Sequence, residues 1–268
     1  MAKIYLVNVG ANTAHSAQAR APLFPNGEFL FVPFPDEGCS AAYERDAWPY
    51  VSDPKLLRTH PDPDWRNLTY GDNCHNRRAK ALLSVQPGDI LLFWALFWKV
   101  ARGSGVFDVE HGERRWCLFG ALTVSQVVKA ERGHDIDLSA AIHDNAALKR
   151  ALKNAHVWDG KLLRTTKKRH DVLFVGDPAR SARFDKAVDL EVYRDGGLLQ
   201  RTILSKDKRR LRWDESPRWN SSLRPCRPIL DLSESTDRAR AEQLRSAVIA
   251  INPEFDLLKV NPAPVHGR

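Results

Sequence analysis

Apolar runs that stop at glycine, proline or polar residues predict most of the regular structure of this chain. Residues 4–9 are rich in β-branched and aromatic side chains and end at Gly10, which predicts a first strand. Continuous apolar runs over 90–98 and 116–124 predict two buried strands, and the polar, glycine-bounded stretch between them indicates antiparallel pairing. Shorter strands are expected over 29–34, where prolines exclude a central position in a sheet, and over 171–176.

Three segments are expected to form helices. The first follows Asp72 and Asn73, either of which can cap it, and ends before the Pro87-Gly88 turn. The other two cover 140–152 and 237–249. Between 38 and 70 the chain has no periodicity, and an ordered loop packed by aromatic side chains is expected there. Because strands outnumber helices without regular alternation, the predicted fold class is α+β, built around a curved sheet or β-barrel with flanking helices.

The composition narrows the class of protein. With 43% hydrophobic and 28% charged residues, the 268-residue chain is typical of globular proteins. No apolar run approaches the roughly 18–20 residues that cross a bilayer, and the N-terminus lacks the apolar region of a signal peptide, so we expect a cytoplasmic protein without membrane contact. The four cysteines lie far apart without a CxxC pair, which predicts reduced, buried thiols. Motifs of the common nucleotide-dependent and hydrolytic enzymes are absent; no metal and no cofactor are expected, and whether the chain is an enzyme stays open.

The net positive charge is concentrated in one segment. The chain carries a formal charge of +8, and residues 161–227 hold 18 Lys plus Arg against 9 Asp plus Glu, so the remainder is nearly neutral. The densest cations are Lys208, Arg209, Arg210 and Arg212, beside Trp213. Such a cluster favours a polyanion through counterion release, and the indole can stack on a base. The charge pattern therefore indicates a nucleic acid or nucleotide as partner, with a solvated surface as the alternative.

A second candidate feature is aromatic. In the strand expected over 90–98, Trp94 and Trp98 point to the same side, and Trp116 begins the expected partner strand. Indoles arranged in this way form a slot that stacks a base, which contributes roughly 1–3 kcal/mol per base. The alternative is that these tryptophans belong to the core.

The expected helix start after residue 71 combines groups that carry chemistry. Asp72, Cys74 and His75 supply a carboxylate, a thiol and an imidazole, the components of an activated nucleophile. Adjacent residues on a helix point apart, however, so the alternative is one buried and one exposed residue. The histidines at 15, 60, 111 and 170 are scattered, and we interpret them as structural.

The order of elements in the first half resembles the PUA-like superfamily that includes the EVE, ASCH and YTH domains. The resemblance covers about residues 1–130 and lies in the opening strand 4–9, the segment 72–79 with Asn76 and Arg77, the Pro87-Gly88-Asp89 turn, and the strands 90–98 and 118–124. It implies a base-binding core over 1–130. Residues 131–268 depart from a compact EVE domain, and we expect them to form a basic α/β extension packed on the core as one unit.

Three short segments look like the nucleotide-modification-associated domain families of bacteria and their phages. They are Asn8-Val9-Gly10-Ala11-Asn12, Tyr70-Gly71-Asp72 and Phe174-Val175-Gly176-Asp177. The resemblance implies a role beside DNA-modification machinery and proposes Asn8, Asn12, Tyr70, Asp72 and Asp177 as ligand contacts.

These observations lead to one main hypothesis and two alternatives. The main hypothesis is a binding protein that recognises a modified base, in DNA rather than RNA, and acts as a partner in modification, restriction or phage defence. Its expected contacts are Asn8, Asn12, Tyr70, Asn76, Arg77, Trp94, Trp98, Lys208, Arg209, Arg210 and Arg212. The first alternative is an enzyme that makes or processes modified nucleotides through Asp72 and His75, with Cys74 as a further candidate near the chemistry. The second is a structural subunit of a modification complex, which would need an exposed apolar patch.

Overall fold

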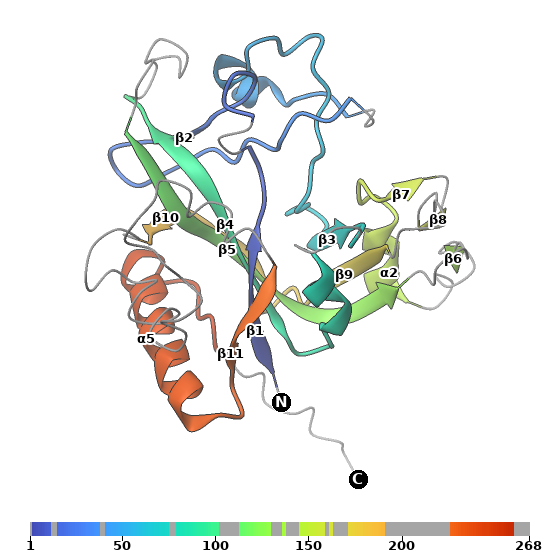
Figure 1. The fold of residues 1–268 in the computed structure, drawn as a ribbon, viewed down its shortest axis with the longest axis vertical. Coiled ribbons are helices and arrows are strands. Elements are labelled where there is room, and N and C mark those ends of the chain that lie inside the picture. Colours follow the sequence, from blue (N-terminus) through green and yellow to red (C-terminus); the bar gives the residue numbers. More distant parts are fainter. Residues whose placement is uncertain are drawn as a thin grey trace.

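The fold is a mixed β-sheet with few helices, shown in Figure 1. The computed structural model describes residues 2–11, 15–37, 41–74, 79–101, 113–129, 136–137, 145–158, 161–162, 171–190 and 226–259. The main sheet contains β1 (Lys3–Asn8), β2 (Ala21–Leu23), β3 (Thr69–Asp72), β4 (Ile90–Lys99), β5 (Arg114–Lys129), β9 (Val172–Gly176), β10 (Ala182–Asp189) and β11 (Arg227–Asp231). A small second sheet contains β6 (Ile136–Asp137), β7 (Val157–Trp158) and β8 (Lys161–Leu162). The helices within the described ranges are α2 (Ala146–Ala151), α5 (Ser235–Ile251) and the 3-10 helices η1 (Arg45–Tyr50) and η2 (Lys80–Ser84).

The main sheet is open. Its strand order is β11-β1-β4-β5-β9-β3, with β10 paired to β5 and β2 paired to β4. β1 and β2 run parallel to β4, whereas the other pairings are antiparallel. Since the end strands β11 and β3 do not pair with each other, the barrel alternative was wrong, and the α+β class is confirmed. Strands from both halves of the chain share this sheet.

The β4–β5 hairpin forms the centre of the core. Phe93 and Phe97 on β4 pack with Phe119 on β5. The other face of β4 carries Trp94, whose ring centroid lies 4.6 Å from that of Trp116. Trp94 and Trp98 are 0% and 4% exposed, so the slot predicted from this strand is not open to a base. Trp94 and Trp98 therefore belong to the core, which was the alternative interpretation of these residues.

Several local predictions need correction. Residues 29–34 form no regular strand. Phe29 makes one isolated bridge with Leu23, and Pro33 and Pro35 cannot donate backbone hydrogen bonds. Asp72, where the helix was expected to begin, instead ends strand β3. Among the described residues between Asp72 and the Gly88 turn, the 3-10 helix η2 is the helical element. The strands over 4–9, 90–98, 116–124 and 171–176 and the helix over 237–249 are confirmed. Part of the helix predicted over 140–152 forms as α2, while residues 138–144 lie outside the described ranges.

The C-terminal helix α5 packs on β10 and β11 and covers one part of the sheet (Figure 1). It buries Ala241, Leu244 and Val248, which lie three to four residues apart on one face. Cys74, Cys117 and Cys226 are buried free thiols, as predicted; Cys39 lies outside the described residues. Among the described residues, no helix is long and apolar enough to span a membrane.

Candidate functional site

A cavity of about 390 Å³, lined by both polar and apolar groups, lies where β1 and β3 end, beneath the loop segments that precede β3. Its size is within the range of small-molecule sites in proteins. Strand ends and loops supply the lining, so polar groups reach the cavity without interrupting a strand. The lining residues are Asn8, Val9, Gly10, His15, Phe34, Asp36, His60, Asp62, Tyr70, Gly71, Asp72, Asn73, Ala79, His156 and Cys226.

A short antiparallel pairing places Asp36 beside His60. The His60 amide donates to the Phe34 carbonyl, and the Asp36 amide donates to the Arg58 carbonyl. The Nδ1 atom of His60 then lies 3.7 Å from an Asp36 carboxylate oxygen. The imidazole stacks on Phe34, with 5.2 Å between ring centroids. Together these contacts fix the orientation of the His60 ring.

Asp62 is buried and held from two sides. One carboxylate oxygen accepts the Gly71 amide at 2.7 Å, and the other accepts the Asn154 side-chain amide at 3.2 Å. The hairpin that connects Asp62 to Gly71 is closed by Asp64, whose backbone exchanges hydrogen bonds with Thr69. With 1% of its side chain exposed, Asp62 depends on these donors rather than on water.

His156 enters the cavity from the loop after α2. Its backbone amide donates to the Asn154 side-chain carbonyl, and the Asn154 amide also donates to the Thr69 hydroxyl. Asn154 therefore ties this loop to β3 and to Asp62 at once. The His156 ring lies directly against Gly71, where a Cβ atom would meet the ring at 2.4 Å. Only glycine allows this close approach.

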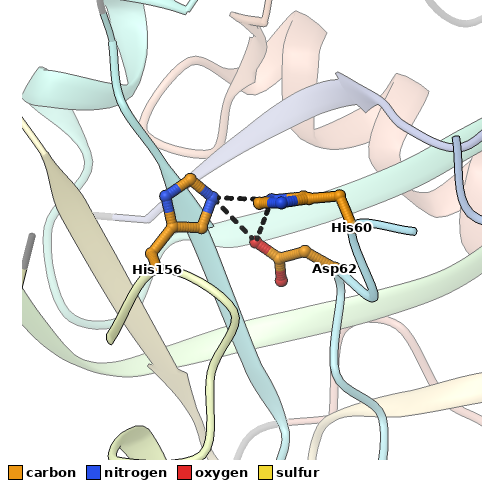
Figure 2. A group of neighbouring side chains, drawn as sticks. All are labelled: His60, Asp62 and His156. Carbon is orange, nitrogen blue, oxygen red and sulfur yellow. Dashed lines mark hydrogen bonds and ion pairs between the residues drawn. The ribbon is translucent and has the colours of Figure 1, made fainter. Parts of the chain in front are cut away.

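His60, Asp62 and His156 converge on one point, as Figure 2 shows. The two Nε2 atoms lie 2.9 Å apart, and the ring planes are nearly perpendicular. Asp62 Oδ2 lies 3.4 Å from Nε2 of His156 and 3.9 Å from Nε2 of His60. Two imidazoles and one carboxylate in this arrangement form a set of groups that can hold a metal ion.

Burial dominates the electrostatics of the cluster. It raises the pKa of Asp62 to about 7 and lowers the pKa of His156 to about 4. Burial and the neighbouring His156 lower the pKa of His60 as well. Both imidazoles are therefore neutral at neutral pH, and each keeps a nitrogen lone pair.

Asp72 and Tyr70, both on β3, also line the cavity. The Tyr70 hydroxyl donates to one carboxylate oxygen of Asp72 at 3.1 Å, and the Cys74 amide donates to the other at 2.7 Å. Burial raises the pKa of Asp72 and raises that of Tyr70 well above its usual value. Asn8 lies at the end of β1, and its side-chain amide donates to the Trp94 carbonyl. The hydrogen bonds from the Tyr70 hydroxyl and the Cys74 amide hold Asp72 in one orientation at the cavity.

The structure brings three of the predicted contact residues together. Asn8, Tyr70 and Asp72 all line the cavity, whereas Trp94 and Trp98 belong to the core. Asp177 is not part of the lining; its carboxylate accepts the Ala179 amide in a turn after β9. The remaining predicted contacts lie outside the described residues: Asn12, His75, Asn76, Arg77, Lys208, Arg209, Arg210 and Arg212.

Sequence reasoning missed the cluster itself. His60 was interpreted as structural, and neither Asp62, Asn154 nor His156 was singled out. His60 and His156 are 96 positions apart, so no local spacing connects them. The one usable signal was Gly71, a glycine inside a strand, which indicates close approach of another group.

Fold and site together define an α+β protein with a cavity lined by histidines and carboxylates at the end of an open mixed sheet. The chain belongs to the nucleotide modification associated domain 3 family, whose model matches residues 3–231. Every residue that lines the cavity falls within this range. Comparisons with curated proteins and with solved structures give no match. The family places the chain in the context of nucleotide modification.

Proposed function

We propose that the protein is an enzyme that processes a modified base or nucleotide in the cavity at the ends of β1 and β3. The observation that carries the proposal is that Asp72 and Tyr70 line the same cavity as His60, Asp62 and His156. A site that only binds a base needs ring faces and hydrogen-bond partners. Several buried titratable groups that line one cavity are instead typical of sites that move protons.

Asp72 is the proposed catalytic group on the β3 side. The Tyr70 hydroxyl and the Cys74 amide hold its carboxylate oxygens, so its position is fixed before a substrate binds. The raised pKa of Asp72 brings the carboxyl closer to the pH at which a group can both accept and donate a proton. Asn8, on the neighbouring strand end, is proposed to contact the base.

The substrate can be a free nucleotide or a base in DNA. A base inside a duplex must leave the stack to enter a cavity of this kind. The proposal assigns the phosphate contacts to the basic segment with Lys208, Arg209, Arg210 and Arg212, because cations there supply affinity without reading sequence. PUA-like recognition of the base, and a partner role in DNA modification or phage defence, remain predictions within this proposal.

Recognition without chemistry is the second candidate function. Phe34 lines the cavity and stacks on both His15 and His60, with centroids 5.6 and 5.2 Å away. Aromatic and imidazole rings of this kind can stack a base, so the cavity can supply the role first assigned to Trp94 and Trp98.

One pair of variants separates the two functions. The full chain is incubated with nucleosides, nucleotides and oligonucleotides, modified and unmodified, and the products are followed by mass spectrometry while binding is measured by calorimetry. Asp72→Asn is expected to abolish turnover and to leave binding nearly unchanged. Asp185→Asn, which alters an exposed carboxylate on β10, is the control and should behave as the unaltered protein.

Three results decide the outcome. Turnover that survives Asp72→Asn contradicts the catalytic role of this residue. Binding of a modified base without any product, under all conditions tested, supports the recognition function instead. Failure to bind any nucleotide or oligonucleotide contradicts both functions.

A further inference from the structure

The three ligand atoms of the His60–Asp62–His156 cluster have the spacing of a metal coordination shell. Their separations are 2.9, 3.4 and 3.9 Å. The point equidistant from three atoms with these separations lies about 2.0 Å from each, which equals the distance from Zn²⁺ to imidazole nitrogen and carboxylate oxygen. An ion therefore fits between the three side chains with little movement.

Hydrogen bonding alone explains the arrangement of His60, Asp62 and His156 less well than a bound metal ion does. Two imidazole nitrogens 2.9 Å apart share one proton at most, so one Nε2 atom donates and the other accepts. Asp62 Oδ2 lies 3.4 and 3.9 Å from the same two nitrogens, distances at which a hydrogen bond is weak or absent. A single cation at the centre satisfies all three atoms together.

The groups behind the ligands are those that metal sites use. Ligating carboxylates are held by hydrogen bonds, and ligating imidazoles are oriented through their second nitrogen. Asp62 accepts from the Gly71 and Asn154 amides, and Nδ1 of His60 faces the Asp36 carboxylate at 3.7 Å. His156 is held against Gly71 and through its backbone by Asn154. All three ligands are therefore positioned before an ion arrives.

We propose that His60, Asp62 and His156 bind one divalent transition-metal ion, of the zinc and iron(II) class, whose remaining coordination positions face the cavity. Two imidazoles select for this class over Mg²⁺ and Ca²⁺, which prefer shells made of oxygen. Three protein ligands leave positions free, the arrangement found in catalytic rather than structural metal sites.

The role of the ion deepens the proposed function and rests on it. Asp72 lines the same cavity from the β3 side, so a water or a substrate oxygen bound to the ion would lie in the space that Asp72 also borders. A metal in such a position acts as a Lewis acid. Binding of the ion itself requires no nucleotide, and the two proposals can be tested separately.

The test measures metal binding by the full chain without nucleotide. Protein stripped with a chelator is titrated with Zn²⁺, Fe²⁺, Mn²⁺, Co²⁺, Mg²⁺ and Ca²⁺ by calorimetry, and the bound metal is counted by elemental analysis. We expect one transition-metal ion per chain and no binding of Mg²⁺ or Ca²⁺ in the same range. At 100 times Kd the ion should raise Tm by about 5–10 °C.

Matched variants locate the ion. His60→Gln and His156→Gln should weaken binding more than about 100-fold, beyond the 10–100-fold typical of changes to outer contacts. His15→Gln changes a histidine of the same cavity outside the cluster and should keep full metal content. If the first two variants fail to fold, the absorption spectrum of the Co²⁺-loaded unaltered protein still distinguishes nitrogen and oxygen ligands from thiolates.

The results separate the two proposals. Three outcomes would overturn the metal site. They are no binding of any transition metal, metal binding by His60→Gln and His156→Gln that equals that of the unaltered protein, and a Co²⁺ spectrum typical of thiolate ligands. Metal bound at the cluster together with no binding of nucleotides would support this site and contradict the proposed function. Nucleotide turnover by metal-free protein, with no ion taken up, would support the proposed function and contradict the metal site.

Discussion

Replacing Gly71 by alanine changes one methyl group at the point where β3 meets the cluster. The added Cβ atom would lie 2.4 and 2.6 Å from two carbon atoms of the His156 ring and 2.9 Å from Asn154 Oδ1. Ordinary contacts of a Cβ atom begin near 3.4 Å. The His156 ring must therefore move by about 1 Å, or β3 must move away from it.

Two effects of different size follow from this displacement. Overpacking of a buried site typically costs about 1–3 kcal/mol, which lowers Tm by roughly 2–12 °C in a chain of this size. Misplacement of a functional group by about 1 Å can lower activity about 100-fold. Gly71→Ala should thus lower turnover, and metal affinity, far more than it lowers stability.

Gly120→Ala is the matched control. A Cβ atom there would meet the Trp65 ring at 2.4 Å, the same overlap as at Gly71, but in the core rather than at the cavity. Chemical denaturation should give a comparable loss of unfolding free energy for the two variants. Calorimetric titration with metal, and product analysis with nucleotides, should distinguish them.

The reasoning about Gly71 is refuted by two results. If Gly71→Ala keeps both its stability and its metal affinity, His156 does not lie against β3 as described. If Gly71→Ala and Gly120→Ala lose metal affinity equally, the loss reflects general destabilisation rather than the position of His156.

Three further predictions concern other parts of the chain. Trp94→Ala should lower the free energy of unfolding by about 3–5 kcal/mol, measured by denaturation, because the indole is fully buried; a loss below about 1 kcal/mol would contradict its place in the core. Asp256 has a pKa below its usual value because Arg245 donates two hydrogen bonds to it, so its stabilising effect is present above pH 3.8 and is lost as pH falls through the lower folded-state pKa. The stability difference between Asp256→Asn and the unaltered protein should accordingly be largest above pH 4 and shrink in acid, whereas a difference that grows in acid would reverse the sign. Replacing the four cations between Lys208 and Arg212 by alanine should reduce the slope of log affinity for duplex DNA against log salt by about 3–4, and an unchanged slope would remove the phosphate contacts.

The central strands could be predicted because burial on both faces leaves a long apolar signature. β4 reads as nine consecutive apolar residues before Lys99, and β9 and the middle of β5 are similar. β10 and β11 carry no such pattern. β10 mixes charged and apolar residues and changes register between Arg183 and Val188, while β11 is short and contains Pro228. Their positions depend on pairing with β5 and β1, which local sequence does not encode.

The residues of the candidate site also fall into two groups, those that the sequence could reveal and those that it could not. Asn8 and Asp72 could be found because each is the polar end of a strand, where side chains reach a cavity. His60 and His156 could not, because each lies in an irregular loop and the two meet only through tertiary structure. The side-chain amide of Asn154, which connects them through Asp62, has no sequence signature at all.

The direct contact between His60 and His156 joins positions 96 residues apart. A fragment cut after residue 130 would keep Asp62 but lose Asn154 and His156, so the buried Asp62 carboxylate would have neither of these partners from the second half. A ligand bound between His60 and His156 would connect the two ends of a long loop. Closing a long loop removes more conformational entropy from the unfolded chain than closing a short one, and therefore stabilises the fold more. We therefore expect that occupancy of the cavity slows unfolding of the entire domain rather than of one segment.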